Sequence, residues 1–155
     1  MQQANTDKIF LNIAKELAAF SKCRSFQMGA VAVKNGRVIA TGVNGSPSGY
    51  TNCCDVFPPN NAPRFNRDTH RAWSVPREVH CEMNLIAQAA RCGIALEGCT
   101  IYITNMPCQN CLKHMIASGI KRIVYKEPYD KADLIDDADD MLIKCNVTLE
   151  KYQGE

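Results

Sequence analysis

The start of the chain carries apolar residues at the spacing of a helix. Separations of three and four residues put these side chains on one face, which predicts an opening amphipathic helix. Asn5 or Thr6 offers a side-chain oxygen that can cap the first free N–H groups. The apolar positions are Ile9, Ile13, Ala14, Leu17 and Phe20.

Two short runs at 29–33 and 38–43 are rich in Val, Ala and Ile. Between them, Asn35 and Gly36 form the dipeptide most typical of a tight hairpin turn. We therefore expect two antiparallel strands.

Residues 44–76 are rich in Gly, Pro, Asn and Ser and show no sustained hydrophobic period. Such a segment is long for a structureless connection inside a compact domain. Something other than a hydrophobic core is therefore expected to order it.

In the second half, helical and strand patterns alternate along the chain. Following the hairpin, this alternation predicts a β-α-β unit within a single α/β domain spanning residues 1–155. The expected fold class is a three-layer α/β/α sandwich around a central five-stranded mixed sheet. The expected elements are helices at 80–91, 108–118 and 132–141 and strands at 100–104, 121–125 and 142–149.

The 155 residues are 46% hydrophobic and 22% charged, with a formal net charge of +2. That charge is too small to favour nucleic acid or a membrane as a partner. Residues 1–20 mix charges among apolar positions and lack the apolar run of a signal peptide, so we expect a cytoplasmic protein. In a reducing compartment, the odd number of nine cysteines favours metal ligands and buried thiols over disulfides.

Two short motifs, each at the start of a predicted helix, carry the chemistry. Cys108 and Cys111 are three residues apart, so both sulfurs lie near the positive end of one helix dipole, which favours thiolates. With His80 they make three zinc ligands and leave a fourth position for water, as in catalytic zinc sites. His114 is a competing ligand on the same helix. The motifs are His80-Cys81-Glu82 and Pro107-Cys108-Gln109-Asn110-Cys111.

Glu82 is expected to move protons rather than bind the metal. Zinc lowers the pKa of water from about 15.7 toward about 7, which makes hydroxide available at neutral pH. Glu82 can take the proton of that water, pass it to a ring nitrogen and later protonate a departing amino group. A lone Cys-x-x-Cys is often redox-active or structural, but such a site gives Glu82 no role.

The two motifs together match the signature of zinc nucleobase deaminases, which is a resemblance and not a derivation. Over nearly its whole length the chain further resembles the deoxycytidylate deaminases, particularly the bacteriophage type. The resemblance implies a cytidine deaminase-like fold and hydrolysis of dCMP to dUMP and ammonia, which feeds thymidylate synthesis. The matching stretches are 28–31, 41–47, 52–55, 80–84, 107–111 and 118–121.

The same resemblance implies which residues contact the nucleotide. Asn44 is expected at the sugar or base, and Tyr129 at the nucleotide. Ser25 and Arg24 form a short basic, hydroxyl-bearing loop suited to a monophosphate. The alternatives are that Tyr129 is a half-buried core residue and Arg24 a solvated one.

Phage-type relatives also carry a structural zinc, whose ligands map to Cys23, Cys53, His70 and Glu78. A closed site of this kind would attach an insertion of about 44–78 to the end of the first helix. Cys54 is the alternative fourth ligand. The other alternative is that these cysteines are unliganded and merely buried.

Relatives are typically homohexamers, activated by dCTP and inhibited by dTTP. The resemblance implies an effector site involving Gly42, Asn44 and Gly45, with Mg²⁺ accompanying the triphosphate. Two positions depart from the common pattern: Cys81 stands where Ala is usual, and Val43 where many relatives have Tyr.

Three other functions compete with dCMP deamination. A broader enzyme would also act on dCTP or free cytidine. An editor of single-stranded nucleic acid would need a basic, aromatic-lined channel, which neither the charge nor the single Trp73 favours. A non-enzymatic zinc module would explain Cys108 and Cys111 alone.

Overall fold

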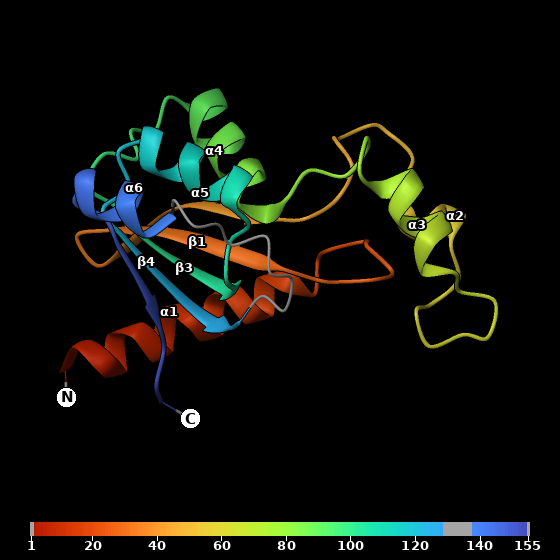
Figure 1. The fold of residues 1–155 in the computed structure, drawn as a ribbon, viewed down its shortest axis with the longest axis horizontal. Coiled ribbons are helices and arrows are strands. Elements are labelled where there is room, and N and C mark those ends of the chain that lie inside the picture. The colour runs from red at the N-terminus through yellow and green to blue at the C-terminus, as the bar shows by residue number, and fades with distance from the viewer. Residues whose placement is uncertain (1, 129–137, 155) are drawn as a thin grey trace.

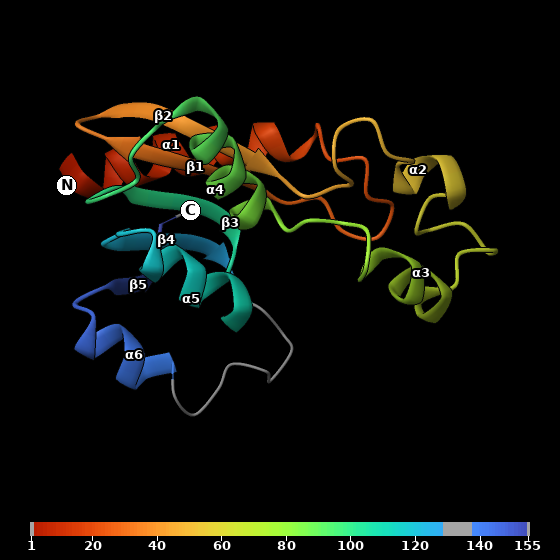
Figure 2. The ribbon, with the colours of Figure 1, turned by 90° about the horizontal axis from the view of Figure 1, so that it is seen from above.

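The computed structural model describes residues 2–128 and 138–154, and its centre is a five-stranded sheet in the order β2-β1-β3-β4-β5 (Figures 1 and 2). β1 pairs antiparallel with β2 and β3, whereas β3, β4 and β5 run parallel. The expected mixed sheet is therefore confirmed. The strands are β1 (Gly29–Lys34), β2 (Arg37–Val43), β3 (Thr100–Asn105), β4 (Arg122–Glu127) and β5 (Thr148–Lys151).

Helices cover both faces of this sheet, with α1 on one side and α4, α5 and α6 on the other (Figure 1). Alternate strand residues serve the two faces, as the pleat requires. Val31 and Tyr102 pack against Leu11 of α1, while Ile101 and Ile103 pack in the core with α4 and α5. The three-layer sandwich is confirmed. The helices are α1 (Gln2–Ala18), α4 (Cys81–Cys92), α5 (Gln109–Ala117) and α6 (Ala138–Lys144).

The hairpin and the β-α-β unit form where the sequence predicts them. Asn35 and Gly36 have φ angles of 52° and 71°, the left-handed pair that a two-residue hairpin turn needs. Farther along, β3, α5 and β4 form the parallel unit.

The start of the first helix departs from the prediction. It begins at Gln2 instead of at Asn5 or Thr6, and the Thr6 hydroxyl donates to the Gln2 carbonyl inside the helix. The reason is that Asp7, two positions before Ile9, is itself buried on the inner face and accepts a hydrogen bond from Gln3. That burial extends the packed face toward the N-terminus.

The end of the chain also departs from the prediction. Leu142 lies in α6 and not in a strand, and β5 begins only at Thr148. Ala138 and Leu142, four residues apart, are both buried, so helical spacing decides this segment. Asn146, in the left-handed conformation with φ of 54°, lies in the turn between α6 and β5. Residues 132–137 of the predicted helix lie outside the described residues.

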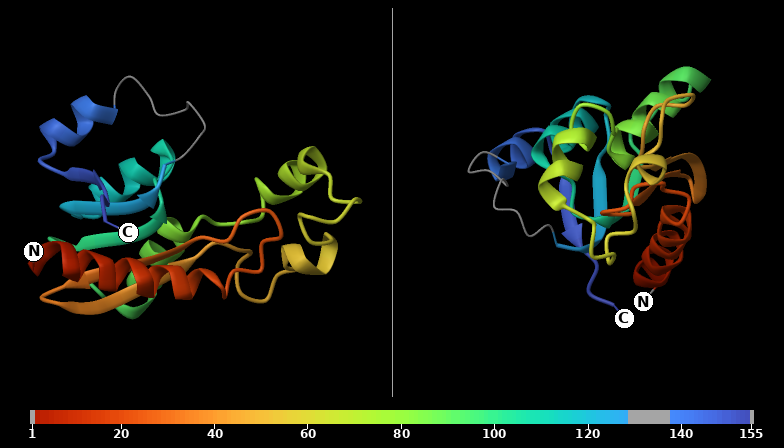
Figure 3. Two further views of the ribbon diagram at one scale, coloured as in Figure 1. Left: turned by 90° about the horizontal axis from the view of Figure 1, so that it is seen from below. Right: turned by 90° about the vertical axis from the view of Figure 1, so that its right-hand side faces the viewer.

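Residues 45–79 form an insertion that extends away from one end of the sheet (Figure 3). The sequence showed no helix here, but α2 (Cys53–Val56) and α3 (Arg67–Ser74) are both present. At the base, the two chain segments bond to each other: Gly45 N–H to the Val79 carbonyl at 3.1 Å, and Val79 N–H to the Gly45 carbonyl at 2.9 Å. The insertion therefore leaves and rejoins the domain at one point.

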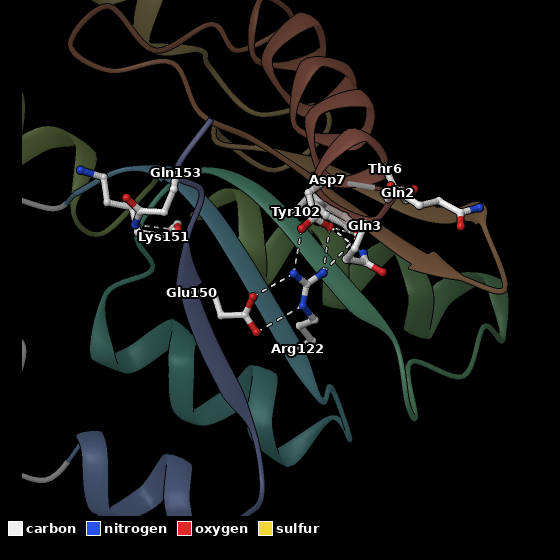
Figure 4. A network of polar contacts seen from close by, with 9 residues as sticks. All are labelled: Gln2, Gln3, Thr6, Asp7, Tyr102, Arg122, Glu150, Lys151 and Gln153. Atoms are coloured by element: carbon white, nitrogen blue, oxygen red, sulfur yellow. Dashed lines mark hydrogen bonds and ion pairs between the residues drawn. The ribbon is translucent and has the colours of Figure 1, made fainter. Parts of the chain in front are cut away.

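A buried polar network connects α1 to the sheet (Figure 4). The Arg122 guanidinium binds both carboxylate oxygens of Asp7 at 2.8 Å, and the Tyr102 hydroxyl donates to Asp7 Oδ1 at 2.8 Å. Arg122 also contacts Glu150 on β5 at 2.8 Å. The network therefore connects α1 to β3, β4 and β5.

None of the helices in the described part of the chain has both the length and the apolar character that a membrane span requires.

Candidate functional site

Two helix starts meet at one end of the sheet and supply the candidate catalytic ligands. His80 is the N-cap residue of α4, and Cys108 is the N-cap residue of α5. Cys111 lies in the first turn of α5. Because β3 ends at Asn105, the short segment after this strand carries Cys108 back toward His80. The fold therefore brings together residues that are 28 and 31 positions apart.

The three ligand atoms have the spacing of a metal site. His80 Nδ1 lies 3.6 Å from the Cys108 sulfur and 3.4 Å from the Cys111 sulfur. All three atoms lie within 4.8 Å of one another. Tetrahedral zinc, with bonds of about 2.0 Å to nitrogen and 2.3 Å to sulfur, places neighbouring ligands about 3.5 Å apart. The donor set and its geometry therefore fit zinc.

The sulfurs of Cys108 and Cys111 share a hydrogen bond. Hydrogen bonds from Cys111 and His80 outweigh burial and lower the pKa of Cys108 to about 4. The hydrogen bond to Cys108, and secondly burial, raise the pKa of Cys111. The bond to Cys108 also raises the pKa of His80. The arrangement stabilises negative charge on sulfur, which a cation requires of its ligands.

Glu82 lies beside this cluster but is not part of it. Its side chain is 2% exposed, in the first turn of α4. Burial raises the pKa of Glu82, against the lowering effects of a backbone hydrogen bond and of His80. The Cys81 thiol donates to Glu82 Oε2 at 3.3 Å. A buried carboxyl group that is not a ligand suits a proton carrier.

The competing ligand His114 lies elsewhere on α5. Its Nδ1 donates to the Asn110 carbonyl one turn earlier in the same helix, at 2.5 Å. The metal-binding group of the described residues contains His80 and omits His114.

A second cluster lies between the insertion and the segment after α1. His70 Nε2, on α3, is 3.1 Å from the Cys53 sulfur at the start of α2 and 3.7 Å from the Cys23 sulfur after α1. All three residues are buried. The rings of Phe57 and Phe65 pack on the imidazole at centroid distances of 5.1 Å and 5.4 Å. Three predicted ligands of a second zinc are therefore together.

Glu78, the fourth predicted ligand, lies near this cluster. Burial, and secondly the nearby Glu78 carboxylate, raise the pKa of Cys23 to about 12. Glu78 Oε1 is a buried oxygen without a hydrogen-bond partner among the described residues. The alternative ligand Cys54 is half-buried, and its sulfur faces Asp55 Oδ1 at 3.7 Å. The metal-binding group of the described residues contains neither Glu78 nor Cys54, so the fourth ligand stays a prediction.

Comparison with known proteins agrees with this geometry. Residues 4–127 match the family described as the cytidine and deoxycytidylate deaminase zinc-binding region. The chain belongs to this family. The expected resemblance to the deoxycytidylate deaminases and the expected class of zinc-dependent deaminase are therefore confirmed.

Individual relatives match over most of the chain. The deoxycytidylate deaminase of enterobacteria phage T4 is 42% identical over 149 residues, covering 78% of this chain and 77% of that protein. ComE operon protein 2 of Bacillus subtilis is 32% identical over 153 residues, covering 99% of this chain and 74% of that protein.

A solved structure shares the fold. The crystal structure of dCMP deaminase from cyanophage S-TIM5, in complex with dCMP and dUMP, matches with a TM-score of 0.74 and 30% sequence identity. The match covers 93% of this chain and 94% of the cyanophage chain. The cytidine deaminase-like architecture is therefore confirmed.

Within the deaminase fold, Asn44 follows β2 and its side chain is used internally. Asn44 Oδ1 accepts from the Met28 N–H and Asn44 Nδ2 donates to the Phe26 carbonyl, both at 2.8 Å. The residue is 8% exposed. These bonds fix the amide between the start of β1 and the end of β2.

The glycines of the predicted effector site have packing roles in the deaminase. A Cβ on Gly42 would lie 2.1 Å from the Cys81 carbonyl oxygen and 2.7 Å from Leu85 N, so only glycine lets β2 approach α4. Gly45 forms the backbone bridge to Val79 at the base of the insertion.

The predicted phosphate contacts lie beside the second cluster. Arg24 and Ser25 line a cavity of about 270 Å³ together with Cys23 and Asn60. None of the catalytic ligands lines this cavity. Arg24 Nε is buried without a partner among the described residues. Tyr129 lies outside the described residues.

One residue near the deaminase site could not be predicted from the sequence. Asn84, on α4, donates from Nδ2 to the Val43 carbonyl at 2.6 Å. This bond joins the catalytic helix to the strand end that carries Asn44. The available signal was an amide two residues after Glu82 in a largely apolar helix, but its partner is 41 positions away.

Proposed function

We propose that the protein hydrolyses deoxycytidine monophosphate to dUMP and ammonia. The observation that carries the proposal is the cluster of His80, Cys108 and Cys111 with the buried, non-ligand Glu82 beside it. Similarity to the phage T4 deoxycytidylate deaminase supports dCMP as the substrate. So does the structural match to a cyanophage enzyme in complex with dCMP and dUMP.

His80, Cys108 and Cys111 would hold the zinc through Nδ1 and two sulfurs. When bound, zinc supplies a Lewis acid that makes water acidic enough to yield hydroxide near neutral pH. The protein's own contribution is the position and protonation of Glu82.

Glu82 accepts a proton from the attacking water and delivers it to N3 of the cytosine as the new bond to C4 forms. The carboxyl group then carries the second proton of that water to the exocyclic nitrogen. The C4–N bond breaks and ammonia leaves, so one water is consumed and C4 gains a carbonyl oxygen. The raised pKa of the buried Glu82 suits a group that must both take and release protons.

Replacement of Glu82 by Gln tests this assignment. The amide has nearly the same shape but cannot accept the proton, so kcat for dCMP should fall by at least about 100-fold. Zinc content and the free energy of unfolding should change little. Glu16→Gln, at an exposed position of α1, is the matched control and should behave as wild type. Activity of Glu82→Gln close to wild type would remove the mechanism.

We also propose which side chains contact the nucleotide. The position of Asn44 after β2, with one amide N–H that has no partner among the described residues, supports a contact to the sugar or base. Tyr129 is proposed at the nucleotide by resemblance alone. The unpartnered Arg24 Nε, with Ser25 in the same cavity, supports an anion contact. Rates with dCMP, dCTP and cytidine would separate a monophosphate enzyme from a broader cytosine-nucleotide deaminase.

We also propose a structural zinc held by Cys23, Cys53, His70 and Glu78. Its support is the buried three-residue cluster and the unpaired Glu78 oxygen. Zinc in a closed site of this kind contributes directly to folding. Here it would order the insertion.

Regulation and assembly are proposed from the resemblance to phage-type deaminases. We expect a homohexamer, activated by dCTP with Mg²⁺ and inhibited by dTTP, near Gly42, Asn44 and Gly45. The dUMP product would feed thymidylate synthesis. Activity with each triphosphate, together with the molar mass in solution, tests these statements.

A further inference from the structure

The catalytic carboxylate receives a hydrogen bond from the residue beside it. The Cys81 sulfur lies 3.3 Å from Glu82 Oε2, and both side chains are buried, at 0% and 2% exposure. We propose that Cys81 is a positioning residue: its thiol holds Glu82 Oε2 and leaves Oε1 as the oxygen that carries protons. This inference rests on the proposed deamination.

The contact is specific because neighbouring residues on a helix usually point in different directions. Successive side chains are about 100° apart around the axis, so adjacent residues do not normally face each other. Here the thiol and the carboxylate do meet, at the first two positions of α4.

No second side chain shares this task in the described structure. Among the described residues, Cys81 is the one side chain that donates a hydrogen bond to Glu82. The thiol itself lies in the apolar core with Ala30, Ala40 and Leu85, where a neutral donor is favoured over an ion. A backbone N–H also bonds the Glu82 carboxyl group, so the thiol is the side-chain donor that completes its orientation.

The role applies throughout the proton transfers. A donor on Oε2 keeps its bond whether Oε1 is ionised or protonated, since the thiol never gives up its hydrogen. The carboxyl plane therefore stays fixed while Oε1 exchanges protons with the substrate. Loss of the donor should leave binding intact and slow the chemical step.

Cys99 is a matched control for the loss of a buried thiol. It is also 0% exposed and belongs to the same core cluster, but it makes no side-chain hydrogen bond to the site. Cys81→Ala and Cys99→Ala therefore remove the same atoms from the same core. Only the first removes the donor.

Steady-state kinetics on the zinc-loaded protein provide the test. Cys81→Ala should lower kcat by about five- to tenfold with KM and zinc content unchanged, the effect of one lost hydrogen bond. Cys81→Ser keeps a donor and should return kcat to within about twofold of wild type, and Cys99→Ala should match wild type. Equal kcat for Cys81→Ala and Cys99→Ala, or Cys81→Ser as slow as Cys81→Ala, would overturn the inference.

An infrared measurement gives an answer independent of turnover. The S–H stretching band of Cys81, identified in wild type by its loss in Cys81→Ala or Cys81→Ser, reports the strength of its hydrogen bond. Glu82→Gln should shift this band toward that of a weaker bond, because a neutral amide is a poorer acceptor than a carboxylate. An unchanged band would contradict the inference about Cys81 and would leave the proposed deamination intact. Absence of deamination by the wild type contradicts the proposed function instead.

Discussion

At the scale of single residues, two glycines set how closely helices approach the sheet. A Cβ on Gly42 would collide with the Cys81 carbonyl of the catalytic helix, and one on Gly29 with the Ala14 carbonyl of α1, at 2.2 Å. Gly42→Ala and Gly29→Ala should each lower the free energy of unfolding by about 2–3 kcal/mol, because backbone must move. Thermal or urea unfolding measures this.

The two glycine variants should differ in activity, because the helices they displace differ. At a temperature where both are folded, Gly42→Ala should lower kcat, since it displaces Cys81 and the start of α4. Gly29→Ala acts on the opposite face and should keep kcat near wild type. A folded Gly42→Ala variant with normal kcat would contradict this prediction, because the start of α4 would then have moved without effect on catalysis.

At the scale of elements, the Asp7 network holds α1 on the sheet. The side chains of Asp7 and Arg122 are 8% and 23% exposed, whereas that of Glu150 is 45% exposed. Asp7→Asn should lower the free energy of unfolding by about 3 kcal/mol, because the half-buried Arg122 guanidinium loses the carboxylate that it binds with two hydrogen bonds. The matched control Glu150→Gln should cost less than about 1 kcal/mol, since that pair is exposed. Equal effects would contradict the account.

The same network predicts a pH dependence of stability. Burial raises the pKa of Asp7, but hydrogen bonds from Arg122, Gln3 and Tyr102 outweigh it and hold that pKa below its ordinary 3.8. The stabilisation is therefore complete above this value and is lost as the pH falls through the lower folded-state pKa. Wild type should lose this increment in acid, and Asp7→Asn should lack it.

Local patterns explain which elements could be predicted. The Asn35-Gly36 hairpin depends on residues next to each other, and the ligand pair of Cys108 and Cys111 depends on one helix turn. The burial of Asp7 could not be predicted, because Tyr102 and Arg122 are 95 and 115 positions away. A polar residue near the N-terminus carries no sign of such partners.

The contact of Cys81 with Glu82 shows a different limit. Both residues belong to the His80-Cys81-Glu82 motif, but the motif gives no sign that their side chains contact each other. Which oxygen it contacts depends on side-chain direction at the helix start. Sequence spacing alone does not fix that direction.

At the scale of the whole molecule, the insertion and the sheet domain contain separate clusters. Trp73, the single tryptophan, lies in the insertion at 5.7 Å from the Phe57 ring and under Arg77. His70→Ala should remove one zinc per chain and shift tryptophan emission toward that of an exposed indole. The catalytic zinc should remain. Metal analysis and fluorescence measure both, and retention of two zinc ions would contradict the proposed structural site.

The central claim is that this protein replaces the amino group of a cytosine nucleotide with an oxygen from water. The most direct measurement is the mass of the product after zinc-loaded protein has acted on dCMP in water enriched in heavy oxygen. The account predicts dUMP carrying one heavy oxygen on the base, with an equal amount of ammonia released. Unchanged dCMP, or dUMP without the label, would contradict it.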